Sequence, residues 1–307
     1  MNNYQLIAFD MDGTLLNSDK QISPETLNAI KRAGDAGKTV ILCTGRNLAE
    51  LNAFTEIIPG LRYLDCVSGA CVYDLKEKKT LYSQALDPGI VKKLMEFALE
   101  EEAMIHVLSE RSIVQRDQQS HMADFHMGIY QTMFDKITDK LENIYNSFCQ
   151  EPFPVLKLNL YHKDEYSRAR TVERIKAAGL ETALALAEST SLECSAKGID
   201  KGIGLKKLCE HLGLPLEQTI AVGDADNDTM ALKTAGLSIA MGNATEPIKA
   251  LADVIVADCD HNGCAEAIDK YLLAENQPQK QLQERLREDI KYNGGIKYYE
   301  NQNCNFK

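Results

Sequence analysis

The stretch Leu6-Ile7-Ala8-Phe9-Asp10-Met11-Asp12-Gly13-Thr14 joins an apolar run to a pair of carboxylates. A short, uninterrupted apolar run of this kind predicts a strand buried in a parallel sheet. Open α/β sheets bind ligands at the carboxyl ends of such strands, where Asp10 and Asp12 would lie. One carboxylate can act as a nucleophile and the other as a general acid and base. The alternative is a strand followed by an ordinary polar turn, because Asp and Gly are common turn residues.

The size and charge of the chain limit what it can be. Its 307 residues are enough for two domains and a sizeable core, and 44% hydrophobic with 26% charged residues is an ordinary globular composition. A formal net charge of −11 argues against nucleic acid or an anionic membrane as a partner. An acidic protein that binds a phosphate ester therefore needs local positive potential from a metal ion, a lysine or a helix N-terminus.

The sequence also indicates a cellular compartment. Its N-terminus lacks a basic segment followed by an apolar stretch, so we expect no signal peptide. No apolar run reaches the ~18 residues of a membrane span. The nine cysteines are scattered and form no Cys-x-x-Cys pair, which indicates reduced thiols. These features predict a cytoplasmic protein without a membrane partner, and they indicate no particular oligomeric state.

Strand and helix patterns divide the chain into parts. Residues 1–83 and 191–275 alternate strands with helices, which predicts an α/β core domain with a Rossmann-like parallel sheet. Residues 84–190 mix helices with short strands and predict an inserted α+β domain. Residues 276–307 form a polar tail, rich in Gln, Lys, Glu and Asn, with one weak helix pattern.

Within the insertion, five elements can be predicted. Asp87-Pro88 is a typical helix start and precedes a helical apolar pattern. Short strands are expected at 104–108 and 113–115. The alternating pattern of 155–160 predicts a strand with one buried and one exposed face. A further helix is expected over 165–178.

Three other polar groups follow predicted strands or begin predicted helices. Thr44 follows the strand 39–43 and could hold a phosphate oxygen; a simple Thr-Gly turn is the alternative. Lys201 could neutralise a phosphate, and it is favoured over Lys197 because an apolar helix begins at Lys201. The alternative is a solvated surface lysine, which is the commoner case. The three carboxylates of Asp224-Ala225-Asp226-Asn227-Asp228 repel one another unless a cation is present, and oxygen ligands of this kind suit Mg²⁺.

These sites, in this order, resemble the motif set of the haloacid dehalogenase (HAD) superfamily. Gly69-Ala70, Lys201-Gly202 and Gly223-Asp224-x-x-Asn227-Asp228 are similar to its Cof-type subfamily, type IIB with a C2 cap. The resemblance covers most of the chain up to residue 272. It implies a Rossmann-like core, an inserted α+β cap that covers the active site, and a phosphatase of small phosphomonoesters, with sugar phosphates as the expected substrates.

The resemblance also implies roles for individual residues. Asp10 would attack phosphorus and form an aspartyl-phosphate, and Asp12 would act as acid and then as base. The cofactor would be Mg²⁺. Its ligands would be the Asp10 carboxylate, the Asp12 backbone carbonyl, Asp224 and, directly or through water, Asp228. The groups that hold the transferring phosphoryl would be Thr44, Gly45, Lys201 and Asn227.

Some features depart from the family or stay outside it. Ser68 stands where the family usually has Asn before Gly-Ala, and Asn262-Gly263-Cys264 replaces a late Asp-Gly-Val. His121 and His126 are five apart, which does not place them on one helix face, so we expect no metal role for them. Other functions stay open: a phosphatase for flavin mononucleotide or pyridoxal phosphate, a phosphosugar mutase, or a non-catalytic phosphate-binding protein.

Overall fold

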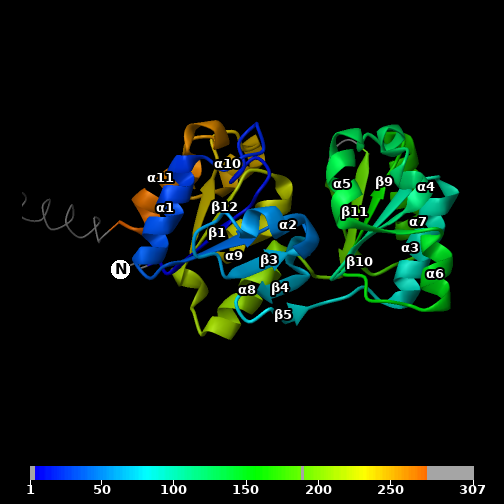
Figure 1. The fold of residues 1–307 in the computed structure, drawn as a ribbon, viewed down its shortest axis with the longest axis horizontal. Helices are drawn as coiled ribbons and strands as arrows, with labels where there is room; N and C mark the ends of the chain where they lie inside the picture. Colours follow the sequence, from blue (N-terminus) through cyan, green and yellow to red (C-terminus); the bar gives the residue numbers. More distant parts are fainter. Residues whose placement is uncertain (1–3, 188–189, 275–307) are drawn as a thin grey trace, which may run out of the picture.

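The computed structural model describes residues 4–187 and 190–274, and they form two sheets with helices packed on them (Figure 1). The first sheet has eight strands in the order β14-β13-β12-β1-β2-β3-β4-β5. The second has six strands in the order β10-β11-β9-β6-β7-β8. The predicted C-terminal tail, with its weak helix, lies outside the described residues.

The eight-stranded sheet forms the core of an α/β unit, as predicted. Its strands are β1 (Leu6–Phe9), β2 (Thr39–Cys43), β3 (Tyr63–Cys66), β4 (Cys71–Asp74), β5 (Lys79–Ser83), β12 (Thr219–Gly223), β13 (Leu237–Ala240) and β14 (Val254–Ile255). The helices of this unit are α1 (Pro24–Asp35), α2 (Leu48–Thr55), α8 (Lys201–Leu212), α9 (Thr229–Thr234), α10 (Glu246–Leu251) and α11 (Gly263–Ala267).

Helices cover both faces of this sheet. Ile7 and Phe9 of β1 belong to one apolar cluster with residues of α1 and α11. Leu6 and Ala8 point to the other face and belong to a cluster with residues of α8, α9 and α10. Because β1 is covered on both faces, its run of apolar residues is continuous rather than alternating.

The prediction of a parallel sheet over residues 1–83 is only partly correct. From β14 to β3 all neighbours are parallel, but β4 pairs antiparallel with β3 and β5 pairs antiparallel with β4. Only residues 67–70 join β3 to β4, and so short a connection can link only antiparallel neighbours.

The six-stranded sheet carries its own helices and forms the cap. Its strands are β6 (Met104–Leu108), β7 (Ser112–Gln115), β8 (Thr138–Leu141), β9 (Lys157–Tyr161), β10 (Thr182–Ala187) and β11 (Ser191–Ala196). Its helices are α3 (Pro88–Glu100), α4 (Arg116–Gln119), α5 (Gln131–Ile137), α6 (Ile144–Gln150) and α7 (Glu165–Ala177). Helices α3, α6 and α7 lie on the side of this sheet away from the core, and α5 lies on the side that faces the core (Figure 1).

Two expectations about the cap differ from the structure. The boundary expected at residue 190 separates β10 from β11, but both strands belong to the six-stranded sheet, so residues 191–196 go with the cap. The strand predicted over 155–160 is buried on both faces, and Lys157 and Asn159 are not solvated. One face of β9 packs on the apolar interior of the cap, and the other faces the core.

No helix among the described residues is long and apolar enough to cross a membrane. The eight cysteines in the described ranges are all free thiols.

Candidate active site

The site lies where the connections of the core sheet change direction. Strands β1 and β12 are parallel neighbours, but the chain continues from β1 toward β2 and from β12 toward β13 on the opposite side. Such a switch point leaves a crevice beyond the carboxyl ends of the two strands. Asp10 directly follows β1 and Asp224 directly follows β12, so the order of the strands brings these two distant carboxylates together.

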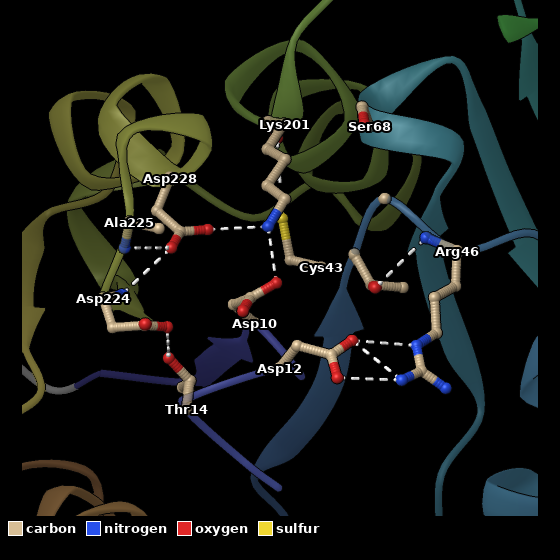
Figure 2. A network of polar contacts seen from close by, with 12 residues as sticks. Asp10, Asp12, Thr14, Cys43, Arg46, Ser68, Lys201, Asp224, Ala225 and Asp228 are labelled. Atoms are coloured by element: carbon tan, nitrogen blue, oxygen red, sulfur yellow. Dashed lines mark hydrogen bonds and ion pairs between the residues drawn. The ribbon is translucent and has the colours of Figure 1, made fainter. Parts of the chain in front are cut away.

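Lys201 lies between Asp10 and Asp228 and is bonded to both (Figure 2). Its Nζ is 2.6 Å from Asp10 Oδ1 and 2.6 Å from Asp228 Oδ1, and all three side chains are buried. It is the first residue of α8, which Asp200 caps by accepting a hydrogen bond from the Ile203 N–H. Burial lowers the pKa of Lys201, but the two carboxylates raise it well above its usual value, so the ammonium stays charged.

A glycine allows α8 to approach this site. Gly69, in the turn between β3 and β4, has φ +91°, and a Cβ there would lie 1.8 Å from the Asp200 carbonyl oxygen. Only glycine permits both this backbone conformation and this contact. The Gly69-Ala70 sequence therefore helps to place the start of α8, and with it Lys201.

Asp224 and Asp228, which both follow β12, have different environments. Asp224 Oδ1 accepts a 2.7 Å hydrogen bond from the Thr14 hydroxyl, and the described residues donate nothing to Oδ2. Asp228 uses both oxygens: Oδ1 binds Lys201, and Oδ2 accepts from the backbone N–H groups of Asp224 and Ala225. Asp228 thus holds Lys201 and the loop in place, whereas Asp224 keeps an oxygen for a ligand.

The donor set fits a hard cation. Asp10, Asp224 and Asp228 each offer an oxygen, and these oxygens lie within 4.8 Å of one another. Burial and the neighbouring carboxylates raise the pKa of Asp10 to about 7, although Lys201 acts to lower it. Burial is also the main cause that raises the pKa of Asp224 to about 6, and the charge of Asp228 adds to it. One ammonium therefore leaves negative charge uncompensated among three carboxylates. A divalent cation with oxygen preference, such as Mg²⁺, would neutralise it.

Asp12 lies apart from this cluster and is held by two cations. Arg46 donates from Nε and Nη2 to its two oxygens at 2.9 Å each, and Lys20 Nζ lies 2.9 Å from Oδ1. Burial acts in the opposite direction, but Arg46 and Lys20 lower the pKa of Asp12. Of the four predicted metal-ligating residues, Asp12 is the one whose side chain points away from the others, and only its backbone was expected to bind metal.

The predicted phosphate-binding groups surround Asp10. Thr44, Gly45 and Asn227 line the same cavity as Asp10 and Asp12, while Lys201 lies buried behind Asp10. Thr44 Oγ1 accepts a hydrogen bond from the Arg46 N–H, which leaves its own hydrogen free to donate. The cavity has a volume of about 280 Å³ and is closed on its far side by the cap.

Among the cap residues that line this cavity, two are charged, and the sequence did not point to them. Lys157 of β9 is 1% exposed, and its Nζ binds Gly45 O at 2.8 Å, Glu193 Oε2 at 3.1 Å and Ser68 Oγ at 3.2 Å. Glu193 lies on the neighbouring strand β11. The available signal was a lysine directly between two leucines in a predicted strand, because a lysine that is buried there requires acceptors. Arg46 was also missed, although it directly follows the predicted Thr44-Gly45 pair.

Other candidates lie away from the cavity. Lys197, the competitor of Lys201, is exposed and paired with Glu181. His121 and His126 are both exposed, and His126 Nε2 is bonded to the Lys163 carbonyl oxygen. None of these side chains lines the cavity that contains Asp10.

Comparison with known proteins agrees with this arrangement. The family model of haloacid dehalogenase-like hydrolases matches residues 7–268, which spans both sheets and every residue of the cluster. The chain belongs to this family. The recognition of a Cof-type HAD protein and the prediction of a hydrolase of the phosphatase class are thereby confirmed.

Individual HAD relatives cover nearly the whole described chain. Phosphatase YwpJ of Bacillus subtilis is 28% identical, over 88% of this chain and 100% of the relative. The 5-amino-6-(5-phospho-D-ribitylamino)uracil phosphatase YcsE of the same organism is 29% identical, over 88% of this chain and 96% of the relative. A solved haloacid dehalogenase-like hydrolase from B. subtilis is 26% identical, with a TM-score of 0.76, and covers 87% of this chain and 100% of the solved chain.

Proposed function

We propose that this HAD protein is a Mg²⁺-dependent phosphatase that hydrolyses small phosphomonoesters through an aspartyl-phosphate on Asp10. The observation that carries the proposal is the position of Asp10, which is buried at the floor of a cavity between core and cap, with one oxygen fixed by Lys201. Its other oxygen is left to attack. The names of the relatives, which act on phosphate esters, support the same reaction class.

In the first step, the free oxygen of Asp10 forms a bond to phosphorus and the bond from phosphorus to the alkoxide breaks. Asp12 gives the leaving alkoxide a proton. Lys201, the Thr44 hydroxyl, the Gly45 N–H and Asn227 hold the phosphoryl oxygens and compensate their charge. Mg²⁺, held by Asp10, Asp224 and the Asp12 carbonyl, would supply further positive charge at the phosphoryl group.

In the second step, water attacks the phosphorus of the aspartyl-phosphate, Asp12 takes a proton from this water, and Asp10 is released. Asp12 is ionised in the structure, which is the form that accepts the proton. The acid role in the first step requires that the hold of Arg46 and Lys20 on Asp12 weakens when substrate binds. The cap lines the cavity opposite Asp10 and would limit the contact of this chemistry with bulk water.

Release of free phosphate separates this function from its alternatives. A phosphosugar mutase would return the phosphoryl group to a sugar, and a phosphate-binding protein would release none. The substitution Asp10→Asn tests the proposal, because an amide is nearly isosteric but a poor nucleophile. We expect an unchanged fold and a loss of at least about a hundredfold in phosphate release. Substantial activity of a clean Asp10→Asn preparation would rule out Asp10 as the nucleophile.

The expected sugar phosphate substrate, the cytoplasmic location and the absence of nucleic acid partners remain predictions from the sequence. Vitamin phosphates are the alternative substrates, and the cap residues that line the cavity would select between them and sugar phosphates.

A further inference from the structure

The cap end of the cavity, opposite Asp10, carries hydrogen-bond acceptors that lack donors. Asn159 on β9 and Glu193 on β11 both line the cavity, and they are directly opposite each other in the antiparallel register, so their side chains lie side by side. Asn159 is 7% exposed, and its Oδ1 is buried with no hydrogen-bond partner among the described residues, while Nδ2 donates to the Tyr161 hydroxyl. A buried carbonyl oxygen normally has a donor, so this one calls for a donor on a ligand.

Two carboxylates that line the cavity also keep an oxygen for a ligand. Glu193 uses Oε2 for Lys157 and Ser68, and its Oε1 receives no hydrogen bond from the described residues. Glu50, in the first turn of α2, uses Oε2 for the Asn47 N–H, and no described residue donates to its Oε1. Burial raises the pKa of Glu50, and the charge of Glu193 adds to this rise although nearby cations act against it. The two carboxylates are therefore close enough to disfavour each other's charge.

The cations that line the cavity have other partners. An ammonium has three hydrogens, and Lys157 directs its hydrogens to two core residues and to Glu193 Oε2. Arg46 is bonded to both oxygens of Asp12 through Nε and Nη2. Counted formally, the carboxylates of Glu50 and Glu193 against the one ammonium of Lys157 leave the cap end with negative charge. A ligand that binds there is expected to bring hydrogen-bond donors and a positive charge.

From this arrangement we propose that the substrate is a small phosphomonoester whose leaving group is a short open chain that ends in a primary ammonium. The proposal rests on the phosphatase function proposed above and names its substrate class. The phosphoryl group lies at Asp10, and the ammonium lies at the cap end between Asn159 Oδ1 and Glu193 Oε1. A primary ammonium has three N–H donors, and its hydrogen bonds to a carboxylate are of the strong, charge-assisted kind. The product beside phosphate is an amino alcohol.

The aromatic side chains of the cap suit a cation as well. Tyr130, Phe134 and Tyr161 line the cavity, and an aromatic ring attracts a cation that lies over its face. His106 packs against Phe134 with ring centroids 4.8 Å apart. Burial lowers the pKa of His106 to about 3, so the imidazole behind Phe134 is neutral at physiological pH and does not repel an ammonium.

A chain that ends in a hydroxyl group is a weaker match for the same place. It donates one hydrogen, so it pairs with one acceptor and leaves the negative charge of the cap end uncompensated. Hydrogen bonds to charged groups also contribute more than those between neutral groups. The cavity has about 280 Å³, whereas sites for drug-sized ligands span about 300–1,000 Å³. A phosphate with a short chain suits this volume.

The test compares phosphate release, as kcat/KM, from matched esters with Mg²⁺ present at neutral pH, where an alkyl ammonium is charged. Aminoethyl, aminopropyl and aminobutyl phosphate are each paired with the hydroxyalkyl phosphate of the same chain length, and a hexose phosphate and acetyl phosphate are added. We expect the best aminoalkyl ester to exceed its hydroxyalkyl partner and the hexose phosphate by about tenfold or more. Acetyl phosphate carries no donor for the cap end and reports the core chemistry alone.

Two variants assign the preference to the residues named. The readout is the ratio of kcat/KM between the aminoalkyl ester and its hydroxyalkyl partner within one variant, so a general loss of rate cancels. Asn159→Leu removes the unpaired acceptor and Glu193→Gln removes the charge, and each should reduce this ratio by about tenfold. The matched controls are Asn146→Leu on α6 and Glu56→Gln at the end of α2, because both residues are exposed. They should leave the ratio unchanged.

The outcomes separate this inference from the function on which it rests. If the hydroxyalkyl esters or the hexose phosphate are hydrolysed as well as or better than the aminoalkyl esters while acetyl phosphate is turned over, the ammonium leaving group is wrong and the phosphatase function stands. If no ester, acetyl phosphate included, releases phosphate above the level of Asp10→Asn, both fail. A ratio that stays the same in both variants, each still folded and active on acetyl phosphate, would overturn the ammonium site at Asn159 and Glu193.

Discussion

Lys157 Nζ, from cap strand β9, lies 2.8 Å from the backbone carbonyl oxygen of Gly45 in the core. This hydrogen bond joins the two sheets at the loop that is proposed to hold the phosphoryl group. The same ammonium binds Ser68 of the core and Glu193 of the cap. The position of the cap and the orientation of the Gly45 peptide are therefore linked through one buried side chain.

We expect Lys157→Met to reduce kcat/KM by about tenfold or more, because the Gly45 peptide is no longer held in place. It should also lower the melting temperature, since breaking a buried ion pair costs about 3–5 kcal/mol, less here because the Glu193 side chain is 19% exposed. Lys163→Met is the matched control, because Lys163 is an exposed cap lysine paired with Glu102. Equal behaviour of the two variants in enzyme assays and thermal melts would contradict the link.

The second prediction concerns Arg46, which holds both oxygens of Asp12. Arg46→Met should lower kcat/KM by about tenfold to a hundredfold, because Asp12 loses its orientation. It also removes a positive charge, so the pKa of Asp12 rises, and the limb of the pH–rate profile that Asp12 governs should move to higher pH.

Arg32→Met provides the control for this change. Arg32 also donates to both oxygens of an aspartate, Asp269, but on the exposed surface of the core. Its substitution should leave the rate and the pH profile unaltered. A pH profile of Arg46→Met that coincides with that of the parent protein would show that Arg46 does not set the pKa of Asp12.

The predictable part of this site is local in the sequence. Asp10, Lys201 and Asp224 each stand next to an apolar strand or at the start of an apolar helix, so their positions at the sheet edge followed from the pattern of one segment. The role of Lys157 could not be predicted in this way. Its partner Gly45 is 112 positions away, and the contact exists only because the cap packs over the core.

The two expectations about the cap that differed from the structure also have physical reasons. An alternating pattern predicts one solvated face, but Lys157 and Asn159 in the pattern of 155–160 face the cavity between cap and core rather than bulk water. Likewise, β11 follows β10 so closely that both join one antiparallel pair, but a boundary drawn at residue 190 from sequence alone separated them.

The third prediction is a requirement for Mg²⁺ that Ca²⁺ does not meet. Mg²⁺ takes near-octahedral geometry at about 2.1 Å, whereas Ca²⁺ takes more ligands at longer distances and would engage both oxygens of Asp10. Phosphate release should stop in excess chelator and return with Mg²⁺ but not with Ca²⁺. Asp224→Asn should raise the Mg²⁺ concentration needed for half-maximal rate by about tenfold or more.

Asp226→Asn is the matched control for the metal site, because Asp226 lies in the same loop but is exposed and outside the cluster of carboxylates. It should leave the Mg²⁺ dependence unaltered. Full activity of the parent protein in excess chelator would remove the metal from the mechanism.

The last prediction concerns stability and pH at Asp65 of β3. This side chain is buried, Oδ2 accepts a hydrogen bond from the Cys43 thiol at 3.0 Å, and Oδ1 has no partner among the described residues. Burial raises the pKa of Asp65 to about 8. An unfolded Asp titrates near about 3.9, so between these two values the folded protein binds the extra proton and its free energy of unfolding decreases as pH rises.

Asp65→Asn removes this titration and keeps the shape of the side chain. The melting temperature of the variant should therefore gain on that of the parent protein as pH is raised from about 5 to about 8. Asp74→Asn should behave in the opposite way, because hydrogen bonds from Arg62 lower the pKa of Asp74 and its carboxylate stabilises the fold at neutral pH. That variant should be destabilised at neutral pH and should approach the parent protein in acid. Melting curves of the three proteins across this range decide the matter: a gap between Asp65→Asn and the parent protein that does not change with pH would mean that Asp65 is ionised in the folded state, despite its burial.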